Sequence, residues 1–219
     1  RNMFDFGTIY QPKFNLLYGL TEHTSLFFNA GRSFQHPIGK SAFTTGDVHA
    51  RDMTFNDGME FGFTWENTDI DVRFSYWQQK AKDEFVSVDG EQINVGKTQR
   101  DGFDTALNWT INDKLLLWAN YSFIDTEIER PSDNALDTVG NELRSIPDFT
   151  ASLGLNYQLT DKLITRLHLD AQGDYYVNED NAGGQFGDFT LLHLSADYDL
   201  DWATLKLQVN NLTDEYYEN

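Results

Sequence analysis

Residues 149–172, FTASLGLNYQLTDKLITRLHLDAQ, decide the fold, because apolar and polar side chains alternate on both sides of a short polar turn. Before the turn at Thr160 and Asp161, every second residue from Phe149 is apolar, and those between are small or polar. After the turn the alternation resumes from Leu163. A period of two over about ten residues is typical of a β-strand with two different faces. The stretch therefore predicts a long antiparallel hairpin.

The same pattern recurs along the chain about every 45 residues, each time with an aromatic residue ahead of the turn. The five turns are Thr21-Glu22-His23, Glu66-Asn67-Thr68, Asn112-Asp113, Thr160-Asp161 and Asp199-Leu200-Asp201. The aromatic residues ahead of them are Tyr18, Trp65, Trp109, Tyr157 and Tyr198. Five hairpins predict ten strands, and aromatics at one common level are typical of a membrane interface.

Composition limits the classes of function. The chain has 219 residues, 35 acidic against 16 basic, and a net charge of −19, so nucleic acid is not an expected partner. It has no cysteine, which excludes disulfides and thiolate metal sites. No apolar run reaches the roughly 20 residues that a membrane helix needs, and no signal peptide is recognisable at the start of the sequence.

Alternation alone does not separate a soluble β-sandwich from a membrane barrel. Three features favour an antiparallel, all-β transmembrane barrel: long strands, aromatics at strand ends, and connections that are short at one end and long at the other. The long connections are expected at residues 35–51, 80–100, 127–147 and 173–188. A soluble all-β binding domain is the alternative, and it would stay in buffer without detergent.

Three segments resemble one family, the TonB-dependent outer-membrane receptors. Residues 12–37, PKFNLLYGLTEHTSLFFNAGRSFQHP, are similar to a strand–turn–strand of that family. Residues 94–104 resemble its entry into a barrel strand, an N-x-G followed by glycine, a hydrophobic residue and an acid. Residues 209–217, VNNLTDEYY, carry the most specific likeness, to its near-C-terminal NLTD-x-x-Y segment.

The resemblance implies a 22-stranded barrel, of which residues 1–219 would be the C-terminal portion holding strands 12 to 21. It implies that the plug domain and the last strand lie outside this stretch. It also implies a place in the outer membrane of a Gram-negative bacterium, among lipid and lipopolysaccharide. The expected function is import of a scarce nutrient with energy supplied through TonB. An iron–siderophore complex is the first expectation for the ligand, and cobalamin, haem, copper or a glycan are the alternatives. A passive porin is the other membrane alternative.

Two groups of residues are candidates for contact with a ligand. The first lies in the first long connection, where cations would attract an anionic siderophore: His36, Lys40, His49 and Arg51. The second comprises polar residues expected to face the lumen: Arg73, Asp104, Arg166, His168, Asp170, His193, Asp197 and Lys206. For both groups a purely structural role, as solvated loop or as mutual ion pairs along the wall, is the alternative.

No enzyme is expected, because no known catalytic motif occurs among the five histidines and the glycine pairs. Acidic residues gather in the long connections and could hold Ca²⁺, but their spacing matches no EF-hand loop, and solubility explains them as well. No cofactor and no metal site are expected.

Overall fold

In the computed structural model, residues 8–35, 53–88, 91–131 and 138–217 are described. These parts of the chain contain strands and turns. The strands are β1 (Lys13–Gly19), β2 (Thr24–Gln35), β3 (Thr54–Glu66), β4 (Ile70–Val88), β5 (Glu91–Asn112), β6 (Leu115–Arg130), β7 (Phe149–Thr160), β8 (Leu163–Gln172), β9 (Tyr175–Tyr176), β10 (Gln185–Phe186), β11 (Phe189–Asp199) and β12 (Thr204–Val209). Among the described residues there is no helix of the length and apolarity needed to cross a bilayer.

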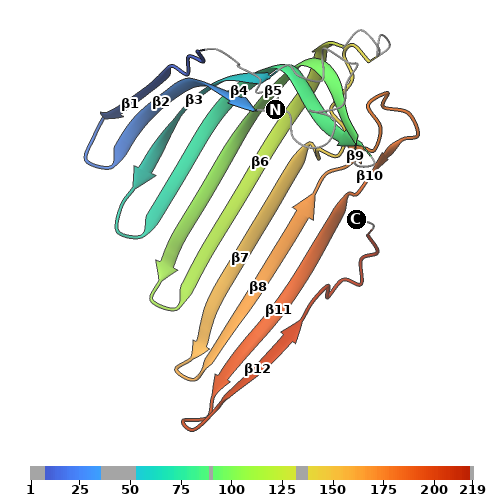
Figure 1. Cartoon of the computed structure of the whole chain (residues 1–219). Coiled ribbons are helices and arrows are strands. Elements are labelled where there is room, and N and C mark those ends of the chain that lie inside the picture. The colour runs from blue at the N-terminus through green and yellow to red at the C-terminus, as the bar shows by residue number, and fades with distance from the viewer. Residues whose placement is uncertain (1–7, 36–52, 89–90, 132–137, 218–219) are drawn as a thin grey trace, which may run out of the picture.

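Ten of the strands form one curved antiparallel meander in the order β1-β2-β3-β4-β5-β6-β7-β8-β11-β12 (Figure 1). The remaining two, β9 and β10, pair only with each other. The prediction of ten strands in five long hairpins is confirmed. The sheet is an open wall, because the described residues of β1 and β12 do not pair with each other.

A side-chain oxygen closes each of the five short turns by accepting a backbone N–H two residues further on. Such local bonds are the reason that Asn, Asp and Thr favour turns. The donor and acceptor pairs are His23 N to Thr21 Oγ1, Asp69 N to Asn67 Oδ1, Lys114 N to Asn112 Oδ1, Lys162 N to Thr160 Oγ1 and Asp201 N to Asp199 Oδ1. The turns predicted from the sequence therefore form for the expected local reason.

The register joins the apolar residues of successive strands into continuous rows. One row crosses seven strands and consists of Leu16, Phe28, Phe61, Tyr76, Phe103, Phe123 and Phe149. Large apolar side chains of this face remain exposed, with Phe61 at 50% and Leu153 at 43%. The apolar face is thus not a protein core. It has the character of a surface that contacts hydrocarbon.

Three of the expected connections contain more regular structure than predicted, and the clearest is the one at residues 80–100. In place of a loop at residues 80–100, β4 continues to Val88 and β5 starts at Glu91, with bulges around residues 81–84. β5 has 22 residues, which at about 3.3 Å per residue exceeds what a tilted strand needs to span a bilayer. The pairing there relies on main-chain bonds and on ion pairs such as Arg100–Glu84, so the apolar period that marks a membrane strand is missing.

Two more of the expected connections are also more ordered, whereas residues 36–52 lie outside the described residues. β6 runs on to Arg130, inside the expected connection at 127–147, and the connection at 173–188 contains the β9–β10 hairpin. The compact apolar cluster of the described residues lies here, formed by Val95, Ile128 and Leu143 with Ile146 packed against it. This end of the wall is therefore a folded structure rather than a set of independent loops.

Candidate functional site

The second face of the sheet, here called the polar face, carries the candidate lumen residues. Arg73 stands beside Ala106 and Thr64 in the register, and Asp104 beside Ser75 and Ser122. The same alternation places Arg166, His168 and Asp170 on this face of β8, where His168 is directly opposite His193. Asp197 is opposite Lys206 across β11 and β12. All eight candidates therefore share one face, opposite to the apolar rows.

The charges of this face are largely matched by neighbours. The Arg73 guanidinium lies 2.8 Å from Glu60 and 4.2 Å from the centre of the Phe27 ring. Glu60 also accepts a hydrogen bond from the side-chain amide of Asn29. Arg166 forms an ion pair with Asp197 at 2.8 Å, and the hydroxyl of Ser122 donates to Asp104. Mutual pairing of this kind is what a polar wall needs for stability, whether or not a ligand passes along it.

Two histidines and one carboxylate converge near β8. Nε2 of His168 lies 3.0 Å from Asp170 Oδ1 without hydrogen-bond geometry, and Nε2 of His193 lies 3.7 Å from Oδ2 of the same residue. The backbone N–H of Asn211 donates to Nδ1 of His193, which fixes that nitrogen as an acceptor. The Trp118 ring flanks His168, with centroids 5.1 Å apart. Among the described residues no cluster of histidines and carboxylates has the geometry of a metal site.

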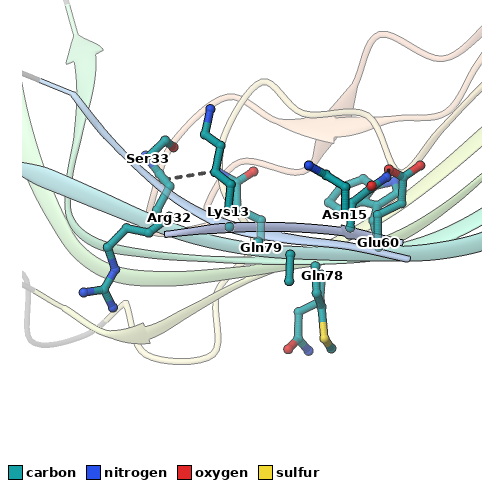
Figure 2. Close-up of a pocket in the computed structure, with 14 residues that line it drawn as sticks. Lys13, Asn15, Arg32, Ser33, Glu60, Gln78 and Gln79 are labelled. Atoms are coloured by element: carbon teal, nitrogen blue, oxygen red, sulfur yellow. Dashed lines mark hydrogen bonds between the residues drawn. The ribbon is translucent and has the colours of Figure 1, made fainter. Parts of the chain in front are cut away.

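Two open grooves lie along the sheet. One, of about 450 Å³, follows β1 to β4, and Figure 2 shows Lys13, Asn15 and Glu60 rising from one side of the sheet while Arg32 points to the other. The second, also about 450 Å³, is lined by Trp118, His168 and Asp170 among others. Both are open depressions of a wall, and neither encloses a ligand by itself.

The sequence did not reveal a set of aromatic rings that cover glycines on the polar face. Phe27 is opposite Gly62, Trp77 opposite Gly102, and Trp118 opposite Gly154. In each pair the ring occupies the space that a glycine Cβ would need, at 2.2 to 2.6 Å. In the sequence these pairs are indicated only by a glycine inside a predicted strand. The ring that covers the glycine can be identified only once the register of the paired strands is known.

The five aromatics predicted for an interface lie at the short-turn ends of their strands. Tyr18, Trp109, Tyr157 and Tyr198 belong to the apolar face and are between 38% and 59% exposed. Trp65 is half-buried and contacts the His23 ring at 6.5 Å. Whether this level is a membrane interface stays a prediction.

A second aromatic band on the apolar face, which the sequence did not indicate, lies further from the short turns. Its rings contact one another at centroid distances between 5.4 and 6.1 Å: Phe61, Phe63, Phe74, Tyr76, Phe103, Tyr121, Phe123 and Phe149. On β7, Phe149 and Tyr157 are eight residues apart, or about 20 Å along the normal for a strand tilted by about 40°. On this strand the separation approaches the roughly 25 Å height of an apolar belt between two aromatic girdles. On β3 the two bands come together, because Phe63 is only two residues from Trp65.

The candidate ligand residues His36, Lys40, His49 and Arg51 lie outside the described residues, so their role stays a prediction.

Comparison with known proteins identifies the family. Residues 2–212 match the profile of the TonB dependent receptor-like β-barrel. The metal-pseudopaline receptor CntO of Pseudomonas aeruginosa is 27% identical over 94% of this chain and 30% of its own length. The crystal structure of the siderophore receptor PiuA from Acinetobacter baumannii superposes with a TM-score of 0.79 at 20% identity, over 94% of this chain and 32% of that one. The ferric citrate transporter FecA, unliganded, gives 0.79 at 21%, over 94% and 34%.

The chain thus spans about a third of the length of these relatives. Their names describe receptors and transporters. The structural likenesses, all below 25% identity, show the fold alone: an antiparallel wall that is part of a larger structure. With the profile match extending over nearly all of its residues, this chain belongs to the family of TonB-dependent receptor β-barrels.

Proposed function

We propose that this chain supplies the C-terminal wall and part of the mouth of an outer-membrane receptor that imports a metal chelate. The ligand class that we propose is an iron–siderophore complex. The observation that carries the proposal is the profile match over residues 2–212. Relatives described as receptors for metal-pseudopaline and for siderophores support the ligand class. Residues 1–219 would act with a plug domain encoded elsewhere in the full-length protein, and TonB would supply the energy through that plug.

The two faces of the sheet support this assignment. Apolar rows bounded by two aromatic bands suit contact with outer-membrane lipid, and long strands that continue beyond them suit lipopolysaccharide and the outside medium. The polar face would line the lumen, with Arg73, Asp104, Arg166 and His168 as representative contacts for a plug or a passing ligand. His36, Lys40, His49 and Arg51 are proposed to meet the ligand at the mouth.

Deleting the gene is expected to abolish energy-dependent uptake of its metal chelate. We would measure uptake of radioactive iron from a panel of ferric siderophores in iron-starved cells, with the wild-type gene returned on a plasmid as the control. Removing TonB should reduce uptake as far as removing the receptor, because transport against a gradient needs that energy. Uptake that depends on the gene but continues undiminished without TonB would identify a passive pore instead.

A further inference from the structure

The chain leaves β12 through a turn that stays attached to β11. Residues 210–217, here called the Asn211 turn, follow directly on Val209, the last residue of β12, and Figure 1 shows them continuing beside β11. The register of the two strands would place Asn211 opposite Leu192. Instead Leu212 N donates to Leu192 O at 2.6 Å, one residue out of register. Asn211 is therefore an extra residue at which the regular pairing is interrupted.

Asn211 closes the turn with its own groups. Its φ of 51° lies in the left-handed region, which asparagine adopts more readily than most residues. Its side-chain amide donates to Glu215 O at 2.8 Å, and its Oδ1 accepts from Glu215 N at 2.9 Å. Further along, the Tyr217 ring lies 5.3 Å from the Phe189 ring between centroids. The turn is thus a compact unit, and the bonds that leave it decide how firmly it is held to β11.

One of these bonds ends on an imidazole instead of a carbonyl oxygen. The backbone N–H of Asn211 donates to Nδ1 of His193 at 3.3 Å. A ring nitrogen that accepts a hydrogen bond carries no proton, so in the neutral imidazole the proton is on Nε2. Nε2 lies 3.7 Å from Oδ2 of Asp170, on the polar face of β8. His193 therefore connects the turn, through its two nitrogens, with a carboxylate of the wall.

A second proton on His193 has only one place to bind. It must enter at Nδ1, the nitrogen that accepts the hydrogen bond from Asn211. In the imidazolium both nitrogens are donors, so two N–H groups would then point at each other and the bond to the turn is lost. Because His193 can hold the second proton only when the turn is released, acid favours release. Attachment of the turn strengthens as the pH rises.

The charged groups around His193 come from every element beside it. On β8, Asp170 favours the imidazolium, whereas His168, whose ring centre lies 5.8 Å from that of His193, opposes it once it is itself protonated. The other charged side chains lie further along the strands or in the turn: Arg166 and Asp197, which pair at 2.8 Å, Lys206 opposite Asp197, and the exposed Asp214 and Glu215. The carboxylate of Asp170 is thus the nearest charge, and it supports protonation at the expense of the bond to Asn211.

We propose that His193 is a proton-sensitive latch at the β12 edge of the wall: the neutral imidazole holds the Asn211 turn against β11, and the imidazolium releases it. Imidazoles ordinarily change charge between pH 5 and 8, so the latch would respond in that range. Asn210 of the turn and His193 line the same groove of about 450 Å³, which a released turn no longer borders. The latch concerns the fold alone and goes beyond the proposed function, because neither a ligand nor TonB takes part.

Hydrogen exchange in the full-length protein, reconstituted in lipid vesicles, tests the latch without any ligand. The quantity compared is the protection factor of the Asn211 and Leu212 amides at pH 8 and pH 5, which corrects for the intrinsic effect of pH on exchange. In the wild type it should fall about fivefold between pH 8 and pH 5, since one hydrogen bond is lost. Amides in the middle of β7 should keep their protection, which shows that the wall remains folded. Equal protection of the turn at both pH values would overturn the proposal, and this comparison needs no variant.

Three variants assign the effect to Nδ1 of His193. H193N places an amide oxygen near the position of Nδ1 but does not titrate, so protection of the turn should stay at the wild-type pH 8 level at both pH values. H193L has no acceptor, and protection should be about fivefold lower at both. H168N is the matched control, because it removes the other imidazole beside Asp170 and leaves the bond to Asn211 in place. It should keep the wild-type dependence on pH. A wild-type fall in H193N, or no fall in H168N, would contradict the latch.

Discussion

G62A is expected to prevent or severely weaken assembly of the wall, although it adds only one carbon. A Cβ on Gly62 would lie 2.1 Å from the carbonyl oxygen of Phe74 and 2.8 Å from the Cα of Ser75, both in the paired strand β4. A flexible side chain could move away from such a contact, but the backbone of a hydrogen-bonded strand cannot. The Phe27 ring, at 2.6 Å, closes the remaining side. We expect a loss of about 3 kcal/mol of unfolding free energy, at the upper end of overpacking effects.

G58A is the matched control, because Gly58 lies on the same strand and the same face. Its Cβ would meet only the carbonyl oxygen of Gln78, at 3.8 Å, which is an ordinary contact. The unfolding free energy should stay within about 0.5 kcal/mol of wild type. Heat-modifiable migration in gels and urea unfolding in lipid vesicles measure both variants. Equal stability of G62A and G58A would show that β3 and β4 do not approach as closely as the structure has them.

The contrast between these two glycines shows the limit of reading this fold from sequence. Local patterns were sufficient for the hairpins: alternation in residues 149–172 and a turn side chain such as Asn67 act within a few residues. Gly58 and Gly62 look alike in the sequence. Only the register, set by pairing along whole strands, places Phe27 opposite one of them.

The same reasoning explains why the sequence predicts loops at residues 80–100, where β4 and β5 continue. Where no hydrocarbon contacts the sheet, neither face needs to be apolar, and Lys80, Lys97 and Glu129 form ion pairs across β4, β5 and β6 instead. The period that identifies a membrane strand then disappears although the strand continues. The small core of Val95, Ile128 and Leu143 was not predicted for another reason. Leu143 and Ile146 are isolated apolar residues in a largely polar connection, and their partners Val95 and Ile128 lie on other strands.

A119R is expected to destabilise the inserted protein by about 2–4 kcal/mol, because it would place a charge on the lipid side near the middle of the apolar belt. Ala119 is opposite Leu107 and Leu153, and it lies between the level of Tyr157 and the second aromatic band. From this depth even a long arginine side chain reaches headgroups only with local thinning of the bilayer. The measurement is the midpoint of urea unfolding in phospholipid vesicles.

N120R is the matched control, because it introduces the same side chain at the adjacent position on the opposite face of the sheet. Comparing the two variants separates the effect of the face from the effect of the arginine itself. Asn120 is exposed and opposite Ala106 and Ser152 on the polar face, where a guanidinium meets water. Its effect should stay within about 1 kcal/mol, since lumen substitutions leave the bilayer contact intact. If N120R were as damaging as A119R, neither face would be lined by water. If N120R alone were damaging, the polar face would be the one that meets lipid, and the eight residues assigned to the lumen would need the opposite interpretation.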